Sequence, residues 1–157
     1  FEFGKEYLKE YKPRVLYLAF DETDDMAHAG NYKMYLTQAH QQDAYLKELW
    51  QYLQNDPQYK DKTTLIITCD HGRGDASPDA WRNHGAGVKN SEQTWVAVMG
   101  PDTPPDGIIK TQTTTYHKQL AQSMAKLLGF DFKAHADHEV GDAIGTMMIK
   151  EKTTLGK

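Results

Sequence analysis

Two clusters of acidic residues and histidines are the parts of this 157-residue sequence best suited to chemistry. One consists of Asp70 and His71, which end an apolar segment and precede Gly72, together with His84 on a polar loop further along. Neighbouring side chains alternate between the two faces of an extended chain, so a turn at Gly72 is needed for the carboxylate and the imidazole to converge. Their mixture of oxygen and nitrogen donors suits zinc, manganese or a related divalent ion. The alternative is a solvated turn in which the aspartate caps the next element.

The other cluster lies upstream, in residues 21–30, where four acidic residues and a histidine fall within eight positions. Like charges this close are costly unless something positive lies among them, and a divalent cation is the simplest such partner. Asp24 and His28 are four residues apart, so one helical turn or a compact loop would direct both to one ion. Asp25, three residues before His28, is the local alternative.

Each cluster follows a segment that the sequence predicts to be a β-strand. Residues 15–20 form a continuous apolar run that is typical of a buried parallel strand, and residues 63–69 form a second such run. Residues 94–99 are predicted to be a third strand, followed by a loop rich in proline and glycine. In open α/β sheets, ligands bind at the carboxyl ends of the strands, which is where both clusters lie.

Helices are predicted between and around these strands. Apolar residues recur at helical spacing before Pro13, and again from residue 31 to the Asn-Asp-Pro sequence at 55–57. A last helix is expected to run through Leu128, with Gly129 as its C-terminal stop and one of three threonines as its N-cap: Thr113, Thr114 or Thr115. This order of elements favours an α/β fold with a mostly parallel sheet and helices on both faces, forming a single domain over residues 1–157.

Composition excludes several classes of protein. The net charge is −4 with acidic and basic residues interspersed, so nothing suggests a nucleic-acid partner. No apolar run approaches the roughly 20 residues that a membrane span needs. Cys69 is the single cysteine, which rules out an internal disulfide and leaves the compartment undecided.

The ordered motifs resemble those of the alkaline phosphatase superfamily, which includes phosphatases, cofactor-independent phosphoglycerate mutases, phosphodiesterases and sulfatases. The sequence ETDDMAHAG at 22–30 resembles its D-x-x-x-H segment, and DHG at 70–72 follows one helix and one strand later, as in the superfamily. His84 with Gly85 corresponds to a further metal-binding histidine. The segments TWVAVMGPDTPPDG and YHKQLAQSMAKLLGF are also similar, so the resemblance extends roughly from residue 13 to residue 141.

The resemblance implies two adjacent divalent metal ions, zinc or manganese. One would be held by Asp24, His28 and His84, and the other by Asp70 and His71 together with an aspartate and a nucleophilic serine or threonine. The family places those last two residues near its N-terminus, and this chain contains no segment of that type. We therefore expect the chain to be the C-terminal half of an alkaline phosphatase-like fold, inactive alone, with the N-terminal half as its partner and the nucleophile unassigned.

Four further residues are candidates for contacting substrate or for orienting the metal ligands. Asp21 and Asp25 could orient His28 or His84, or replace Asp24 as ligands. Arg73 or Arg82 could clamp a phosphate oxygen bidentately, and a solvated arginine on a polar loop is the alternative.

The sequence thus predicts a metal-dependent phosphoester hydrolase or phosphotransferase that acts on a small phosphorylated substrate. A sulfatase acting on a sulfated substrate is the nearest enzymatic alternative. A non-catalytic metal-binding or interaction domain is the alternative from another class of protein.

Overall fold

The computed structural model describes residues 1–110 and 114–149, and these form two compact units. Unit 1 comprises Phe1–Lys60 and His71–Trp95, and unit 2 comprises the described residues of Asp61–Asp70 and Val96–Lys157. Both units are discontinuous in sequence, because the second part of unit 1 is inserted between the two parts of unit 2. The single domain over residues 1–157 stays a prediction.

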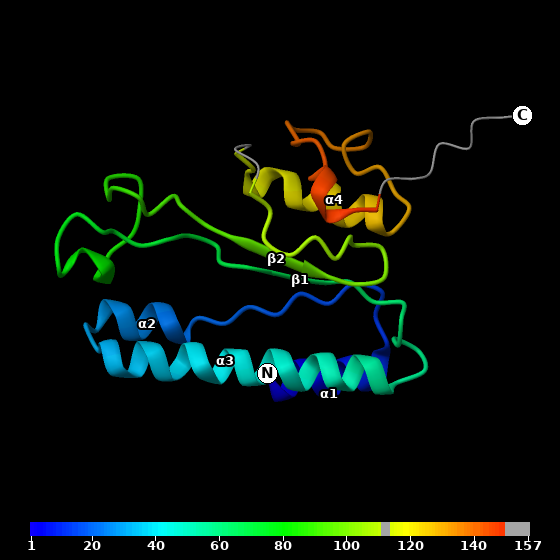
Figure 1. The fold of residues 1–157 in the computed structure, drawn as a ribbon, viewed down its shortest axis with the longest axis horizontal. Coiled ribbons are helices and arrows are strands. Elements are labelled where there is room, and N and C mark those ends of the chain that lie inside the picture. Colours follow the sequence, from blue (N-terminus) through cyan, green and yellow to red (C-terminus); the bar gives the residue numbers. More distant parts are fainter. Residues whose placement is uncertain (111–113, 150–157) are drawn as a thin grey trace, which may run out of the picture. The chain divides into compact units, whose positions relative to one another are not determined.

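Unit 1 is built on three helices, α1 (Glu2–Tyr11), α2 (Glu22–His28) and α3 (Tyr32–Asn55), with α2 packed on α3 (Figure 1). The helices predicted from apolar spacing are thereby confirmed in α1 and α3. Helix α1 is attached to α3 by an ion pair of 2.5 Å between Lys5 and Glu48, and the ring of Phe1 stacks on that of Tyr45. The buried apolar residues of this unit are Leu8, Ala27, Leu49, Leu53 and Tyr59.

The junction between α2 and α3 is tight. Gly30 has a φ of 68°, and the amide of Asn31 donates to the carbonyl of Met26 at 2.9 Å, which is the pattern that closes a helix on a left-handed glycine. The Asn31 side chain then accepts a hydrogen bond of 3.1 Å from the Met34 amide and so caps α3. Asp24 and His28 therefore lie on a helix, one of the two conformations that their spacing allowed.

Unit 2 contains a two-stranded sheet of β1 (Leu65–Thr68) and β2 (Val96–Met99). Both strands fall within segments predicted as strands. They pair antiparallel, with Leu65 opposite Met99 and Thr68 opposite Val96, so the predicted parallel pairing is not confirmed. A parallel pair needs a crossover connection that is usually a helix. The residues between β1 and β2 contain only a three-residue 3₁₀ helix, η1 (Ala80–Arg82). The start of β2 therefore pairs with the end of β1, which makes the two strands antiparallel.

The predicted strand at residues 15–20 was wrong, because this segment has no strand assignment in the structure. It runs with alternating exposure, with Leu16, Leu18 and Phe20 half-buried between exposed neighbours, as an extended chain does. An apolar run favours an extended conformation, but a strand also requires a partner with which to exchange backbone hydrogen bonds. The two strands of the described residues pair with each other.

The C-terminal part of unit 2 forms around α4 (Leu120–Leu127), which follows a 3₁₀ turn, η2 (His117–Gln119). The cap before this turn is Tyr116 and neither Thr114 nor Thr115, while Thr113 lies outside the described residues. The predicted stop after Leu128 is confirmed by Gly129, whose φ is 81°. A second 3₁₀ helix, η3 (Gly145–Met147), follows, and the buried apolar residues here are Val140, Ile144 and Met147. None of the described helices is both long enough and apolar enough to cross a membrane.

Candidate metal centre

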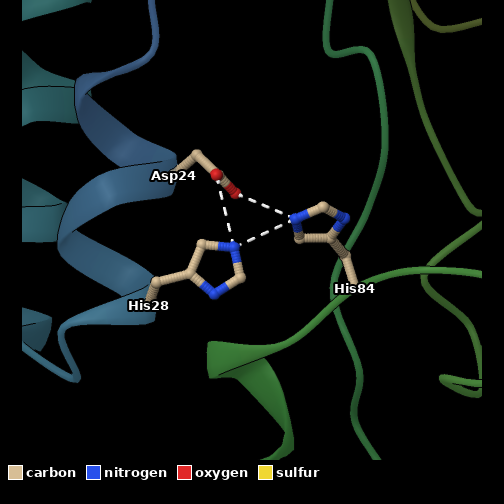
Figure 2. Close-up of side chains that lie close together, drawn as sticks. All are labelled: Asp24, His28 and His84. Carbon is tan, nitrogen blue, oxygen red and sulfur yellow. Dashed lines mark hydrogen bonds and ion pairs between the residues drawn. The ribbon is translucent and has the colours of Figure 1, made fainter.

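Three side chains in unit 1 converge so closely that they could hold a metal ion. Asp24 and His28 project from α2, and His84 projects toward them from the loop that follows η1 (Figure 2). The Nε2 atom of His28 lies 3.3 Å from Asp24 Oδ2 and 3.0 Å from His84 Nε2, and His84 Nε2 lies 3.5 Å from Asp24 Oδ1. The group therefore offers one oxygen and two nitrogen donors that face one another.

These separations fit a single small ion. An ion with tetrahedral bonds of about 2.0–2.2 Å separates its donor atoms by about 3.3–3.6 Å. The distances of 3.0, 3.3 and 3.5 Å among Asp24, His28 and His84 are at or slightly below this range. All three side chains are partly exposed, which leaves a route for an ion and room for a further ligand such as water.

Hydrogen bonds made by Ser91 hold the loop that carries His84. The buried hydroxyl of Ser91 accepts a hydrogen bond of 3.2 Å from the Gly85 amide and donates one of 2.9 Å to the Gly85 carbonyl. The Ser91 carbonyl in turn accepts a hydrogen bond of 2.7 Å from the Gly72 amide. One serine thus ties together the residues that follow His71 and His84. A serine in a polar loop carries no sequence signal for this role, so Ser91 was not predicted.

His71 lies beside the group. Its ring stacks on that of His84 with centroids 3.7 Å apart and an interplanar angle of 12°, and its Nε2 is 3.7 Å from Asp24 Oδ1. Its Nδ1 lies 2.8 Å from the Gly72 carbonyl, which can only accept a hydrogen bond. The neutral ring therefore carries its proton on Nδ1, and the lone pair of Nε2 faces the carboxylate.

Arg73 pairs with the candidate ligand Asp24. Its Nη2 donates to Asp24 Oδ1, its Nη1 donates to the Trp81 carbonyl at 3.4 Å, and its Cζ lies 6.0 Å from the centre of the Tyr35 ring. The Arg73 side chain is only 14 % exposed. The sequence suggested a phosphate clamp or a solvated side chain for this residue, and in the structure its guanidinium binds an aspartate.

The other predicted site residues are not members of the group that could hold an ion. Asp21 is the N-cap residue of α2, and its carbonyl accepts hydrogen bonds from the amides of Asp24 and Asp25. The Asp25 side chain is exposed, and Arg82 lies against Gly30. Asp70 belongs to unit 2, where it is exposed two residues after β1. The group that could hold an ion, as found among the described residues, consists of Asp24, His28 and His84 alone.

The fold and the site define an α/β protein with one oxygen and two nitrogen donors gathered on a helix and a loop. Comparison with protein families extends this description, because the model of the type I phosphodiesterase / nucleotide pyrophosphatase family matches residues 2–144. The chain belongs to this family, which is a member of the alkaline phosphatase superfamily, and the resemblance found in the sequence is confirmed. Neither the curated proteins nor the solved structures contain a match to the chain.

Proposed function

We propose that this protein is a metal-dependent phosphoester hydrolase or phosphotransferase with the C-terminal part of an alkaline phosphatase-like fold. Membership of the phosphodiesterase family supports phosphoester chemistry. The observation that carries the metal dependence is the convergence of Asp24, His28 and His84. A carboxylate and two imidazoles are a donor set that divalent metal ions such as zinc commonly take.

In this proposal one divalent ion is held by Asp24, His28 and His84, and a second by Asp70 and His71, as the superfamily resemblance implies. Zinc or manganese suits the mixture of carboxylate and imidazole donors best. When bound, such ions supply Lewis acidity and stabilise charge on the oxygens of a phosphoryl group. The contact between His71 Nδ1 and the Gly72 carbonyl supports this assignment, because it favours the tautomer in which Nε2 carries the lone pair that a metal ion needs.

A hollow next to the two stacked histidines supports the proposal that a small substrate binds at this site. It has a volume of about 640 Å³ and is lined by His71, His84 and residues 85–92. This volume falls in the range that small-molecule sites occupy, about 300–1,000 Å³. We propose a small phosphorylated substrate there.

No residue of this chain is assigned as the nucleophile. We propose that a serine or threonine in another segment of the same protein supplies it. Reading the coding sequence upstream of Phe1 tests this directly. A strand ending in aspartate, followed later by a helix that carries serine or threonine, would support the proposal, and a cysteine in that place would favour a sulfatase.

The metal dependence is tested by isothermal titration of the 157-residue chain with zinc and with manganese at neutral pH, after dialysis against EDTA. Two tight sites, or one tight and one weak, are expected. Asp24→Ala should remove the site formed with His28 and His84. An absence of binding for both metals would overturn the proposed site and leave family membership alone.

The reaction class is tested with a protein that contains both this chain and the proposed nucleophile-bearing segment. Hydrolysis of bis(p-nitrophenyl) phosphate, p-nitrophenyl phosphate and p-nitrophenyl sulfate separates diesterase, monoesterase and sulfatase activity. Activity on a phosphate ester that is lost with EDTA and regained with zinc or manganese is expected. Turnover of the sulfate ester alone would contradict phosphoester chemistry.

A further inference from the structure

Arg73 contacts the candidate metal group and carries a permanent positive charge. Its guanidinium donates to Asp24 Oδ1, the same oxygen that lies 3.5 Å from His84 Nε2. Arginine stays protonated throughout the pH range of proteins, so its charge persists at this oxygen under all working conditions. Any cation that binds Asp24 must therefore share the carboxylate with an existing cation.

We propose that Arg73 competes with the divalent cation for the Asp24 carboxylate and so weakens the affinity of the Asp24, His28 and His84 group for the ion. This inference rests on the metal site of the proposed function. Its physical basis is repulsion between like charges a few ångströms apart, which is screened poorly where side chains are partly buried. The Arg73 side chain is 14 % exposed, so solvent screens its charge only in part.

The remaining contacts of Arg73 keep it at this position. The carbonyl of Trp81 accepts from Nη1, and the guanidinium lies over the ring of Tyr35, which is itself 5.7 Å from the ring of Trp81. These neighbours restrict the side chain before any ion arrives. Arg73 is thus held beside Asp24 by several contacts.

The competition has two opposite consequences for the protein. Without metal, Arg73 neutralises Asp24 and stabilises unit 1. With metal, the same charge lies next to a doubly charged ion and opposes its binding. Replacing Arg73 by a neutral residue of similar length should therefore lower stability in the absence of metal and raise the affinity for metal.

The experiment is isothermal titration with zinc of the 157-residue chain and of two variants, Arg73→Gln and Arg82→Gln. Arg82 is the matched control, because it is a second arginine of the same inserted segment and lies against Gly30. We expect Arg73→Gln to bind zinc roughly tenfold more tightly than the unmodified chain. Arg82→Gln should bind with unchanged affinity.

A thermal unfolding series provides an independent readout. Arg73→Gln should have the lower Tm of the two proteins after EDTA treatment and the larger rise in Tm when zinc is added. Should Arg73→Gln not fold, Arg73→Met preserves the apolar stem and is titrated in its place, with the same expected gain in affinity.

Two results would overturn the inference, and they are distinguishable. If the unmodified chain binds zinc and the folded Arg73 variant binds it equally or more weakly, Arg73 does not compete, and the proposed metal site survives. If neither protein binds zinc, the proposed metal site fails and the inference fails with it.

Discussion

The imidazole rings of His71 and His84 stack at 3.7 Å, although one residue precedes the three-residue helix η1 and the other follows it. The stack places the Nε2 atoms of both rings within 3.7 Å of the same oxygen, Asp24 Oδ1. Two imidazoles and a guanidinium around one carboxylate oxygen make Asp24 the centre of the site.

His28 should be needed for metal binding, because it supplies one of the three converging donors. Loss of a residue that merely orients a ligand typically weakens metal binding by about 10–100-fold, so His28→Ala should weaken zinc binding by about a hundredfold or more. His40→Ala is the control, since His40 is also an exposed histidine on a helix. Isothermal titration that gives equal affinities for the two variants would contradict the assignment.

Ser91 should stabilise unit 1 through its two hydrogen bonds to Gly85. Ser91→Ala leaves a backbone amide and a carbonyl without their partner and should lower the free energy of unfolding by about 1–2 kcal/mol. Urea denaturation measures this loss. Ser77→Ala, an exposed serine of the same segment, should change the free energy by no more than about 0.5 kcal/mol.

Gly30 should not tolerate a side chain. Its φ of 68° is unfavourable for other residues, and an added Cβ would lie 2.6 Å from Arg82 Cζ. Gly30→Ala should therefore destabilise the protein by about 1–2 kcal/mol in urea denaturation. Gly87→Ala is the matched control, because nothing lies within 4 Å of the corresponding Cβ position, and its effect should be near zero. Equal stabilities of the two variants would refute the role of the left-handed junction.

Asp131 should make the stability of the protein depend on pH in acid. The hydrogen bond from Lys126, followed by those from Gln122 and the Ala134 amide, lowers the pKa of Asp131 from 3.8 to about 2. Because the folded-state pKa is below the unfolded-state value, the stabilisation is complete above pH 3.8 and is lost as the pH falls toward 2.

The measurement is the Tm of the protein and of Asp131→Asn between pH 2 and pH 7. The variant should melt at a lower temperature near neutral pH, and the gap should close between about pH 4 and pH 2. Asp106→Asn, at an exposed position of the same unit, serves as control and should follow the unmodified protein throughout. A gap for Asp131→Asn that is constant with pH would contradict the assigned hydrogen bonds.

Local pattern was sufficient to predict the helices, because the apolar spacing that marks α1 and α3 is a property of each helix alone. It also showed that one helical turn would bring Asp24 and His28 together, but it left Asp25 as an alternative, and the family resemblance favoured Asp24. The strand predicted at residues 15–20 was wrong because a strand, unlike a helix, is not a property of its own segment alone. Strand pairing depends on a partner elsewhere in the chain, and no local pattern specifies that partner.

The contacts of the inserted segment were beyond sequence reasoning. His84 approaches Asp24 because of a loop held by Ser91, and the loop has no periodic pattern from which its course could be predicted. The residue pattern grouped His84 with Asp70 and His71, and only the family resemblance assigned it to the ion of Asp24 and His28. The partner of Arg73 was missed for the same reason, since a charged residue on a polar loop has many candidate partners and the fold selects Asp24.

The left-handed Gly30 makes the turn between α2 and α3 short, so two of the three candidate donors lie on a helix that is packed against its neighbour. Most of the ordering entropy of ligation then falls on one inserted loop, whose freedom the Ser91 hydroxyl has already reduced. In the proposed site a cation would therefore be captured with little rearrangement of its ligands, and a change that loosens this loop would raise the rate at which the ion dissociates.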